Sequence, residues 1–193
     1  DETFSVVASI LPLGDLVRQV AGDAVSVFVL VGPGQSPATC DPSPRQMARL
    51  EGADAFFRVG VPFENVLVPK IRTTCPDLAV VHVAEGLAHH DPDHDGHGDT
   101  DPHTWLDPLK TSRIAVVIRN ALARWRPELA PTFDANLRRF QKRLQAVHGD
   151  LDTRLAPFAG RQVYVFHPSF GHFFARYGLE QVAVEHHGKE PGS

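Results

Sequence analysis

The residues best suited to chemistry lie in one stretch, 89–108, which holds five of the chain's eleven histidines. Aspartates are interleaved with these histidines, and no apolar periodicity begins before Trp105, so the stretch cannot build a core. Imidazole and carboxylate groups are common ligands of divalent metals. The stretch therefore predicts a metal-binding loop.

This loop divides into two parts of different character. Residues 89–99 form a low-complexity tract that is suited to exchangeable metal capture, because a flexible chain loses entropy whenever it wraps an ion. Residues 101–108, Asp-Pro-His-Thr-Trp-Leu-Asp-Pro, predict a compact turn that leads into a helix and presents His103. A turn histidine hydrogen-bonded to Asp101 is the structural alternative for His103. The histidines expected to capture metal in the first part are His89, His90, His94 and His97.

The composition is that of a globular protein. The chain has 193 residues, of which 42% are hydrophobic and 22% are charged, and this excludes fibrous and disordered classes. A net charge of −4 without a basic run argues against nucleic acid as a partner. No apolar run of about 18 residues is present to predict a membrane span, and a signal peptide is expected to be absent or already removed. For Cys40 and Cys75, a bridge, two free thiols or a metal ligand all remain open.

The first part of the chain predicts a parallel α/β sheet. Short β-branched and apolar runs alternate with helical spacing, which is the pattern of strands joined by crossover helices. Ser43 and Gln46 form the sequence signature of a capping box at a helix start. The histidine loop follows the fourth strand, on the side where α/β sheets bind ligands. The strands are expected at residues 4–9, 25–31, 55–59 and 78–83.

The second part predicts a long helix and a small β-α-β unit. Apolar residues spaced by three and four from Phe133 to Leu155 predict a helix of roughly 35 Å. Strands are expected at 162–166 and 181–185, which is too little sheet to bury both faces, so the second lobe is expected to be incomplete. The predicted domains are an N-terminal α/β lobe at 1–126 with a histidine-rich loop at 84–104, a long linking helix at 127–158, and the start of a second α/β lobe at 159–193.

Three motifs carry a resemblance to a known family. They are Pro-Gly-Gln-Ser-Pro at 33–37 with Asp-Pro-Ser at 41–43, the octapeptide at 101–108, and His-Pro-Ser-Phe-Gly at 167–171. The chain resembles the zinc- and manganese-specific solute-binding proteins of bacterial ABC importers (ZnuA-like, zinc branch). The resemblance implies two α/β lobes joined by a long rigid helix, with a metal held between them by three imidazoles and a carboxylate. It also implies a periplasmic or cell-surface location, delivery to an ABC permease in the membrane, and no enzymatic activity.

The resemblance places two ligands in this chain. His103 and His167 fall on ligand positions of the family, and a histidine at the second position resembles the zinc branch, because imidazole suits Zn²⁺ whereas carboxylate suits Mn²⁺. The family's first histidine corresponds to Ala38, and its final carboxylate lies beyond Ser193. The chain thus resembles a C-terminally truncated member without the first ligand histidine. Cys40, His186, His187 and the loop histidines are the possible recruits, whereas His172 is interpreted as a packing or surface residue.

The leading functional hypothesis is capture of Zn²⁺, or alternatively Mn²⁺, for delivery to an ABC-type importer. Zinc binding requires neutral imidazoles, so affinity is expected to fall as the pH drops through about 6.5. One alternative is an oligomeric or domain-swapped zinc buffer or chaperone, in which the incomplete lobe pairs its strand edge with another chain. Another is a zinc-dependent hydrolase, although the sequence contains no His-Glu-x-x-His helix or nucleophile elbow.

Overall fold

The computed structural model describes residues 4–35, 40–87 and 101–184, which belong to two compact units. The sheet unit draws on Asp1–Gly86 and Ser112–Gln141, and the histidine unit draws on Leu87–Thr111 and Lys142–Ser193. One boundary between these units falls between Gly86 and Leu87, and the other two fall inside helices α4 (Pro108–Trp125) and α5 (Ala130–Leu155). The domain limits 1–126, 127–158 and 159–193 remain a prediction.

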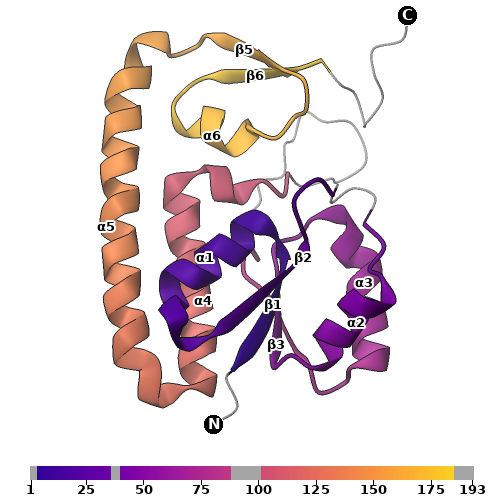
Figure 1. Cartoon of the computed structure of the whole chain (residues 1–193). Helices are drawn as coiled ribbons and strands as arrows, with labels where there is room; N and C mark the ends of the chain where they lie inside the picture. Colours follow the sequence, from indigo (N-terminus) through magenta and orange to yellow (C-terminus); the bar gives the residue numbers. More distant parts are fainter. Residues whose placement is uncertain (1–3, 36–39, 88–100, 185–193) are drawn as a thin grey trace, which may run out of the picture. The chain divides into compact units, whose positions relative to one another are not determined.

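The sheet unit is built on a parallel sheet of four strands. These are β1 (Ser5–Ile10), β2 (Ser26–Val31), β3 (Ala55–Arg58) and β4 (Ala79–His82), in the order β2-β1-β3-β4. At the centre of the register, Val7 pairs with Phe28 on one side and Phe56 on the other. The predicted α/β class with a parallel sheet is therefore confirmed (Figure 1).

Helices α1 (Leu11–Ala21), α2 (Pro44–Glu51) and α3 (Pro62–Thr74) belong to the same unit. The predicted capping box is present at α2, where the Ser43 backbone N–H donates to Gln46 Oε1 over 2.8 Å and Ser43 Oγ accepts from the Gln46 backbone N–H. Pro69 lies inside α3 without ending it. The buried apolar face of α3 compensates for the hydrogen bond that a proline cannot donate.

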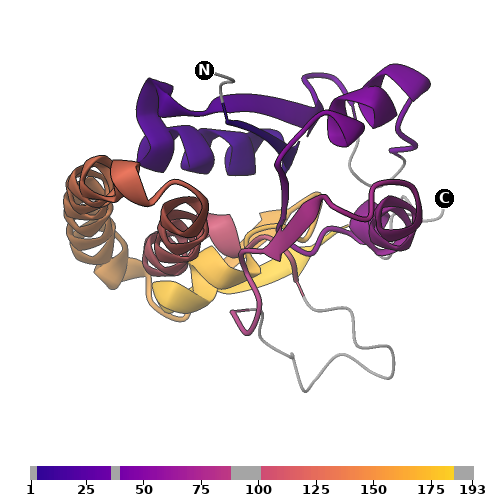
Figure 2. The same cartoon turned by 90° about the horizontal axis from the view of Figure 1, so that it is seen from below.

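Helices α4 and α5 lie side by side where they belong to the sheet unit (Figures 1 and 2). Arg119 of α4 and Asp134 of α5 form an ion pair at 2.7 Å. The ring centroid of Trp125 lies 5.6 Å from that of Phe4 and 6.2 Å from that of Phe57. These contacts pack the end of α4 against the core. At 26 residues α5 has a length of roughly 39 Å at about 1.5 Å per residue, so the predicted long helix is confirmed.

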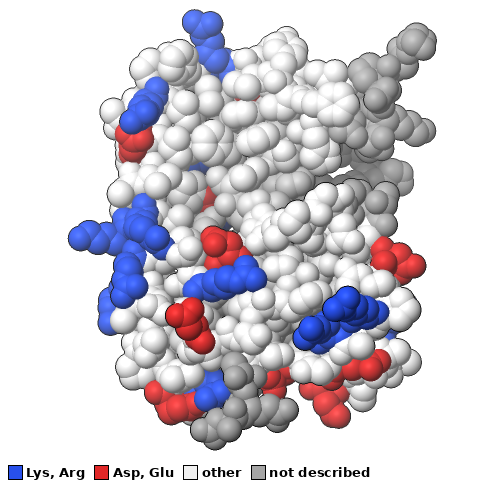
Figure 3. Space-filling view, viewed as in Figure 1, with Lys and Arg blue, Asp and Glu red and all other residues white. Residues whose placement is uncertain are grey.

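The surface of α5 is basic. Figure 3 shows Lys and Arg side chains gathered along the edge where α5 lies in the same view of Figure 1. Such a face repels divalent cations and is no candidate for a metal site. Within the described residues, neither α5 nor any other helix combines the length and apolar character of a membrane span. The exposed cations of its middle turns are Arg138, Arg139, Lys142 and Arg143.

The histidine unit contains a β-α-β arrangement, as predicted. Strands β5 (Gln162–Val165) and β6 (Glu180–Ala183) pair in parallel and are connected by the short helix α6 (Gly171–Arg176). The side chains of β5 alternate between exposed and half-buried, and Tyr164 is 70% exposed. Short 3₁₀ helices complete the described chain: η1 (Gly22–Ala24), η2 (Thr104–Leu106), η3 (Pro127–Leu129) and η4 (Ala156–Phe158).

Candidate metal centre

His103 is oriented by the aspartate two residues before it. Asp101 Oδ1 accepts a hydrogen bond from the His103 backbone N–H at 2.9 Å and lies 2.7 Å from His103 Nδ1. A carboxylate that accepts from Nδ1–H fixes the ring and leaves Nε2 as the nitrogen available to a metal. A turn histidine bonded to Asp101 and a metal ligand oriented by Asp101 would thus have the same geometry at His103.

The carboxylate of Asp101 is held in its ionised form. Its burial by itself raises the pKa, but the hydrogen bonds from the side chain and backbone of His103, together with nearby imidazoles, outweigh burial and lower the pKa. An ionised Asp101 accepts more strongly from Nδ1–H and makes the opposite ring nitrogen a better metal ligand.

His167 lies in the segment that follows β5, at the carboxyl end of that strand. Its carbonyl oxygen accepts from the Ser169 backbone N–H at 2.8 Å, and the Phe170 backbone N–H donates to Gln181 Oε1 of β6 at 2.8 Å. These bonds tie the turn to the two-stranded sheet. The side chain of His167 is exposed, whereas that of His103 is only 20% exposed.

The structure brings these two histidines together within the histidine unit. Their ring centroids are 5.5 Å apart and the ring planes are inclined at 81°. Two imidazoles bound to one zinc ion at about 2.1 Å in neighbouring tetrahedral positions have ring centres roughly 5 Å apart. The spacing therefore suits a shared ion, and metal binding by His103 and His167 remains a prediction.

Among the described residues, no further predicted ligand forms a metal-holding group with this pair. Across 4–35, 40–87 and 101–184, no group of three or more His, Cys, Asp or Glu side chains is arranged to hold a metal ion. Cys40 and Cys75 are free thiols, and burial together with the charge of Asp41 raises the pKa of Cys40, which disfavours the thiolate that zinc requires. The remaining candidates lie outside the described residues: Ala38, His89, His90, His94, His97, His186 and His187.

An ion pair joins Asp107, the residue before α4, to Arg176, the last residue of α6. Asp107 is 1% exposed and accepts from Arg176 Nη2 at 2.8 Å and Nε at 3.0 Å. Its Oδ1 also accepts from the Leu109 backbone N–H at the start of α4. Burial alone raises the pKa of Asp107, but the bonds from Arg176 and from the backbone lower it overall. Because 69 residues separate the partners, sequence spacing gave no sign of this pair.

The buried residues His172 and Lys110 are also part of this unit. His172 is 4% exposed, so its interpretation as a packing residue holds and that as a surface residue is wrong. Its ring nitrogens contact Lys110 Nζ at 2.8 Å and the backbone oxygen of Asp101 at 2.9 Å. The neighbouring Phe173 and Phe174 were the available signal that His172 is buried, but nothing in the sequence indicated that His172 would meet Lys110.

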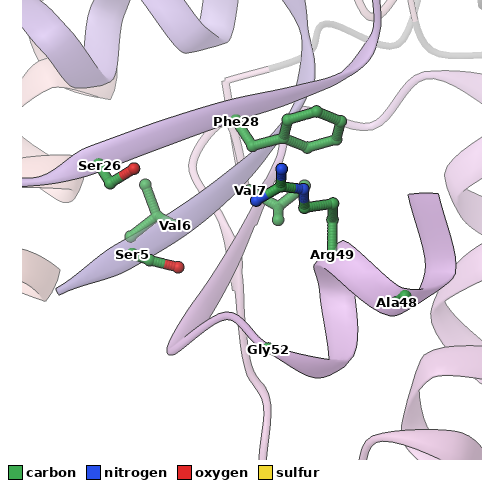
Figure 4. Close-up of a pocket in the computed structure, with 8 residues that line it drawn as sticks. All are labelled: Ser5, Val6, Val7, Ser26, Phe28, Ala48, Arg49 and Gly52. Atoms are coloured by element: carbon green, nitrogen blue, oxygen red, sulfur yellow. The ribbon is translucent and has the colours of Figure 1, made fainter. Parts of the chain in front are cut away.

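A separate pocket of about 140 Å³ lies in the sheet unit (Figure 4). Its lining contains no histidine, cysteine or carboxylate, and Figure 4 shows the Arg49 guanidinium beside the ring of Phe28, at 5.8 Å from the centroid. It therefore lacks the donors of a metal site. The lining residues are Ser5, Val6, Val7, Ser26, Phe28, Ala48, Arg49 and Gly52.

Comparisons with known proteins identify the class and then the family. The computed fold superposes on a crystal structure of ZnuA with a TM-score of 0.90 and 30% identity, covering 100% of this chain and 74% of that one. The zinc-uptake complex component A family (ZnuA, periplasmic) matches residues 6–193. The fold is thus that of an α/β solute-binding component, and the chain belongs to the ZnuA family.

Individual relatives are identical to this chain at about a quarter of the aligned positions. The zinc-binding lipoprotein AdcA of Streptococcus pneumoniae serotype 4 is 28% identical over an alignment of 196 positions, which covers 95% of this chain and 39% of AdcA. The high-affinity zinc uptake system protein ZnuA of Yersinia pestis is 27% identical, covering 92% of this chain and 64% of that protein. The chain thus spans between two fifths and two thirds of the length of these relatives. The crystal structure of Zn(II)-bound AdcA from Streptococcus pneumoniae matches with a TM-score of 0.82 and 26% identity, over 96% of this chain and 40% of that one.

Proposed function

We propose that this chain captures Zn²⁺ outside the cytoplasm, in the periplasm or at the cell surface, and delivers it to the permease of an ABC-type importer. The observation that carries the proposal is the 5.5 Å separation of the His103 and His167 rings. Membership of the ZnuA family and relatives named for zinc binding and zinc uptake support it. Mn²⁺ is the less favoured ion, because two imidazoles suit Zn²⁺ better than Mn²⁺.

The two ligands have different parts in this proposal. His167 is exposed and meets an incoming ion first, whereas His103 is held in place by Asp101 and completes the pair. A fixed ligand loses little conformational freedom on binding, and an exposed ligand allows the ion to leave again. This division suits a protein that must both bind and release its cargo. The loop histidines are proposed to collect zinc and raise its local concentration.

No catalytic step is proposed. The family is that of a zinc-uptake component, and zinc is the cargo of the site rather than a resident cofactor.

Zinc titration in the presence of a competing chelator tests the proposal. The double change His103→Ala with His167→Ala is expected to lower zinc affinity by at least about 100-fold, because both proposed ligands of the shared ion are lost. His148→Ala is the matched control, since His148 lies in the same unit but contacts Tyr177 Oη at 3.2 Å rather than the pair. Unchanged tight binding in the double variant, with loss of binding when the four loop histidines are replaced, would assign the zinc site to residues 89–99.

A further inference from the structure

A buried chain of contacts links α4, α6 and the turn that holds His103. Lys110 Nζ of α4 lies 2.8 Å from His172 Nδ1 of α6, and His172 Nε2 lies 2.9 Å from the Asp101 backbone oxygen. Lys110 is 7% exposed and His172 is 4% exposed, so both side chains are removed from water. Asp101 then contacts His103 through its carboxylate. The chain of contacts therefore ends on a proposed zinc ligand.

The donors and acceptors of the contacts that run from Lys110 through His172 to Asp101 have one consistent assignment. A lysine ammonium only donates, so His172 Nδ1 must accept from Lys110. A neutral imidazole that accepts at Nδ1 carries its proton on Nε2, and this N–H donates to the Asp101 carbonyl oxygen. Both ring nitrogens are thus engaged within the protein. His172 is a bridge in this arrangement and not a third zinc ligand.

The close approach of Asp101 also restricts the residue before His172, which is Gly171. A Cβ atom added at Gly171 would lie 2.8 Å from Asp101 Oδ2, which is closer than real side chains approach. The other oxygen of that carboxylate is engaged by His103 and cannot move away without breaking its hydrogen bonds. Gly171 and His172 together place the beginning of α6 directly against Asp101. Helix α6 also contacts η2, which begins immediately after His103.

The segment that leads into α6 carries the second proposed ligand, His167. His167 lies four residues before Gly171, and the Phe170 N–H fixes the intervening turn to Gln181. A displacement of the beginning of α6 from Asp101 would change the distance between the His103 and His167 rings.

We propose that His172, held by Lys110, is a positioning residue that fixes the Asp101 turn against α6 and so sets the separation of the His103 and His167 imidazoles for zinc. This inference rests on the proposed function of that pair. Removing one partner of a buried hydrogen bond leaves the other partner unsatisfied, which lowers the free energy of unfolding. The loss of either hydrogen bond of His172 is therefore expected to loosen the Asp101 turn.

Two variants of the full 193-residue chain separate positioning from packing. His172→Phe keeps a ring of similar bulk but removes both hydrogen bonds, whereas His172→Gln retains an N–H donor near the position of Nε2. Zinc affinity, measured by chelator competition, is expected to be at least about 10-fold lower in His172→Phe than in the unsubstituted protein. In His172→Gln it is expected to lie within about threefold of the affinity of the unsubstituted protein. Thermal unfolding of both variants controls for general loss of stability.

The zinc-free protein gives a second readout. In ¹H–¹⁵N spectra of the imidazole groups, the His103 Nδ1–H signal is expected in the original chain and in His172→Gln, and to be shifted or exchange-broadened in His172→Phe. Because no metal is present, this signal tests the positioning claim even if His103→Ala shows that the chain binds zinc elsewhere. Failure of the proposed function and failure of the positioning role are thus distinguished.

Two results would overturn the proposal. One is zinc affinity and a His103 signal in His172→Phe that match the original chain. The other is an equal loss of affinity in His172→Phe and His172→Gln that follows the loss of thermal stability. If His172→Phe does not fold, His172→Gln is compared with His172→Asn, which lacks a donor near the Nε2 position. Tighter zinc binding by the Gln variant supports the positioning role of His172, and equal binding by the two variants refutes it.

Discussion

The two units differ in what holds them together. In the sheet unit, five of the six residues of β1 are buried, and Phe56 and Phe57 of β3 are fully enclosed. In the histidine unit, none of the four residues of β5 is buried, and Tyr164 is largely exposed. Apolar burial therefore dominates in the first unit, whereas the second combines a smaller apolar cluster, which includes Phe174, Tyr177 and Leu179, with polar contacts around Asp101 and Asp107. Directional bonds suit the unit that is proposed to hold two imidazoles for zinc, because they fix orientation as well as distance.

The largest effect is expected in the core of the sheet unit. Phe57→Ala removes a side chain that is 0% exposed and packs against Trp125, so the free energy of unfolding should fall by about 3–5 kcal/mol. Denaturant unfolding measures this change. Phe158→Ala is the control, since Phe158 is 50% exposed and its loss leaves no enclosed cavity. A loss below about 1 kcal/mol for Phe57→Ala would show that burial does not dominate this unit.

A smaller effect is expected from the ion pair of the histidine unit. Asp107→Asn removes the charge opposite Arg176 and should cost about 2 kcal/mol, because Asp107 is buried but Arg176 is 34% exposed and its attraction is partly screened by solvent. Denaturant unfolding measures it. Arg154→Gln is the matched control, since its ion pair with Asp150 is exposed. Equal losses in the two variants would contradict the importance of burial for the Asp107 pair.

The same ion pair predicts a loss of stability in acid. The folded-state pKa of Asp107 is lowered, so its contribution is present above the ordinary aspartate pKa of about 4 and is lost as the pH falls through the folded-state value. The free energy of unfolding should therefore decrease as the pH falls below about 5, and it should decrease less in Asp107→Asn. Parallel pH profiles of the two proteins would be incompatible with this linkage.

The smallest effect is expected on the exposed face of β5. Tyr164→Ser in the 193-residue chain should change the free energy of unfolding by no more than about 0.5 kcal/mol, because Tyr164 is 70% exposed. Val165, its neighbour on the same strand, is half-buried, and Val165→Ser provides the comparison. A larger loss from Tyr164→Ser than from Val165→Ser would mean that β5 gains stability from its exposed face.

Local patterns in the sequence predicted much of this fold. Apolar runs gave the strands of both sheets, the Ser43 and Gln46 pair gave the start of α2, and the spacing of three and four gave the length of α5. These features depend on residues close in sequence, where backbone geometry relates pattern directly to structure. The end of α3 was less predictable, because packing outweighed the cost of Pro69.

The candidate site was predictable only in part. His103 and His167 stood out because the motifs around them resemble a known family. The bridge from Lys110 through His172 to Asp101 was not predictable, since 62 and 71 residues separate its members and no periodicity relates them. A polar residue among apolar neighbours looks the same in sequence whether its partner is water or a buried amine. Only the folded chain distinguishes these cases.

The proposed function requires that His103 and His167 share one zinc ion. Long-range ¹H–¹⁵N spectra of the histidine side chains, recorded while zinc is added up to one equivalent, test it directly. If the ion is shared, the Nε2 signal of His103 and a ring nitrogen signal of His167 should shift together at the first addition, with Nδ1 of His103 still protonated. Shifts confined to the histidines of 89–99, with His103 and His167 unchanged up to one equivalent, would contradict it.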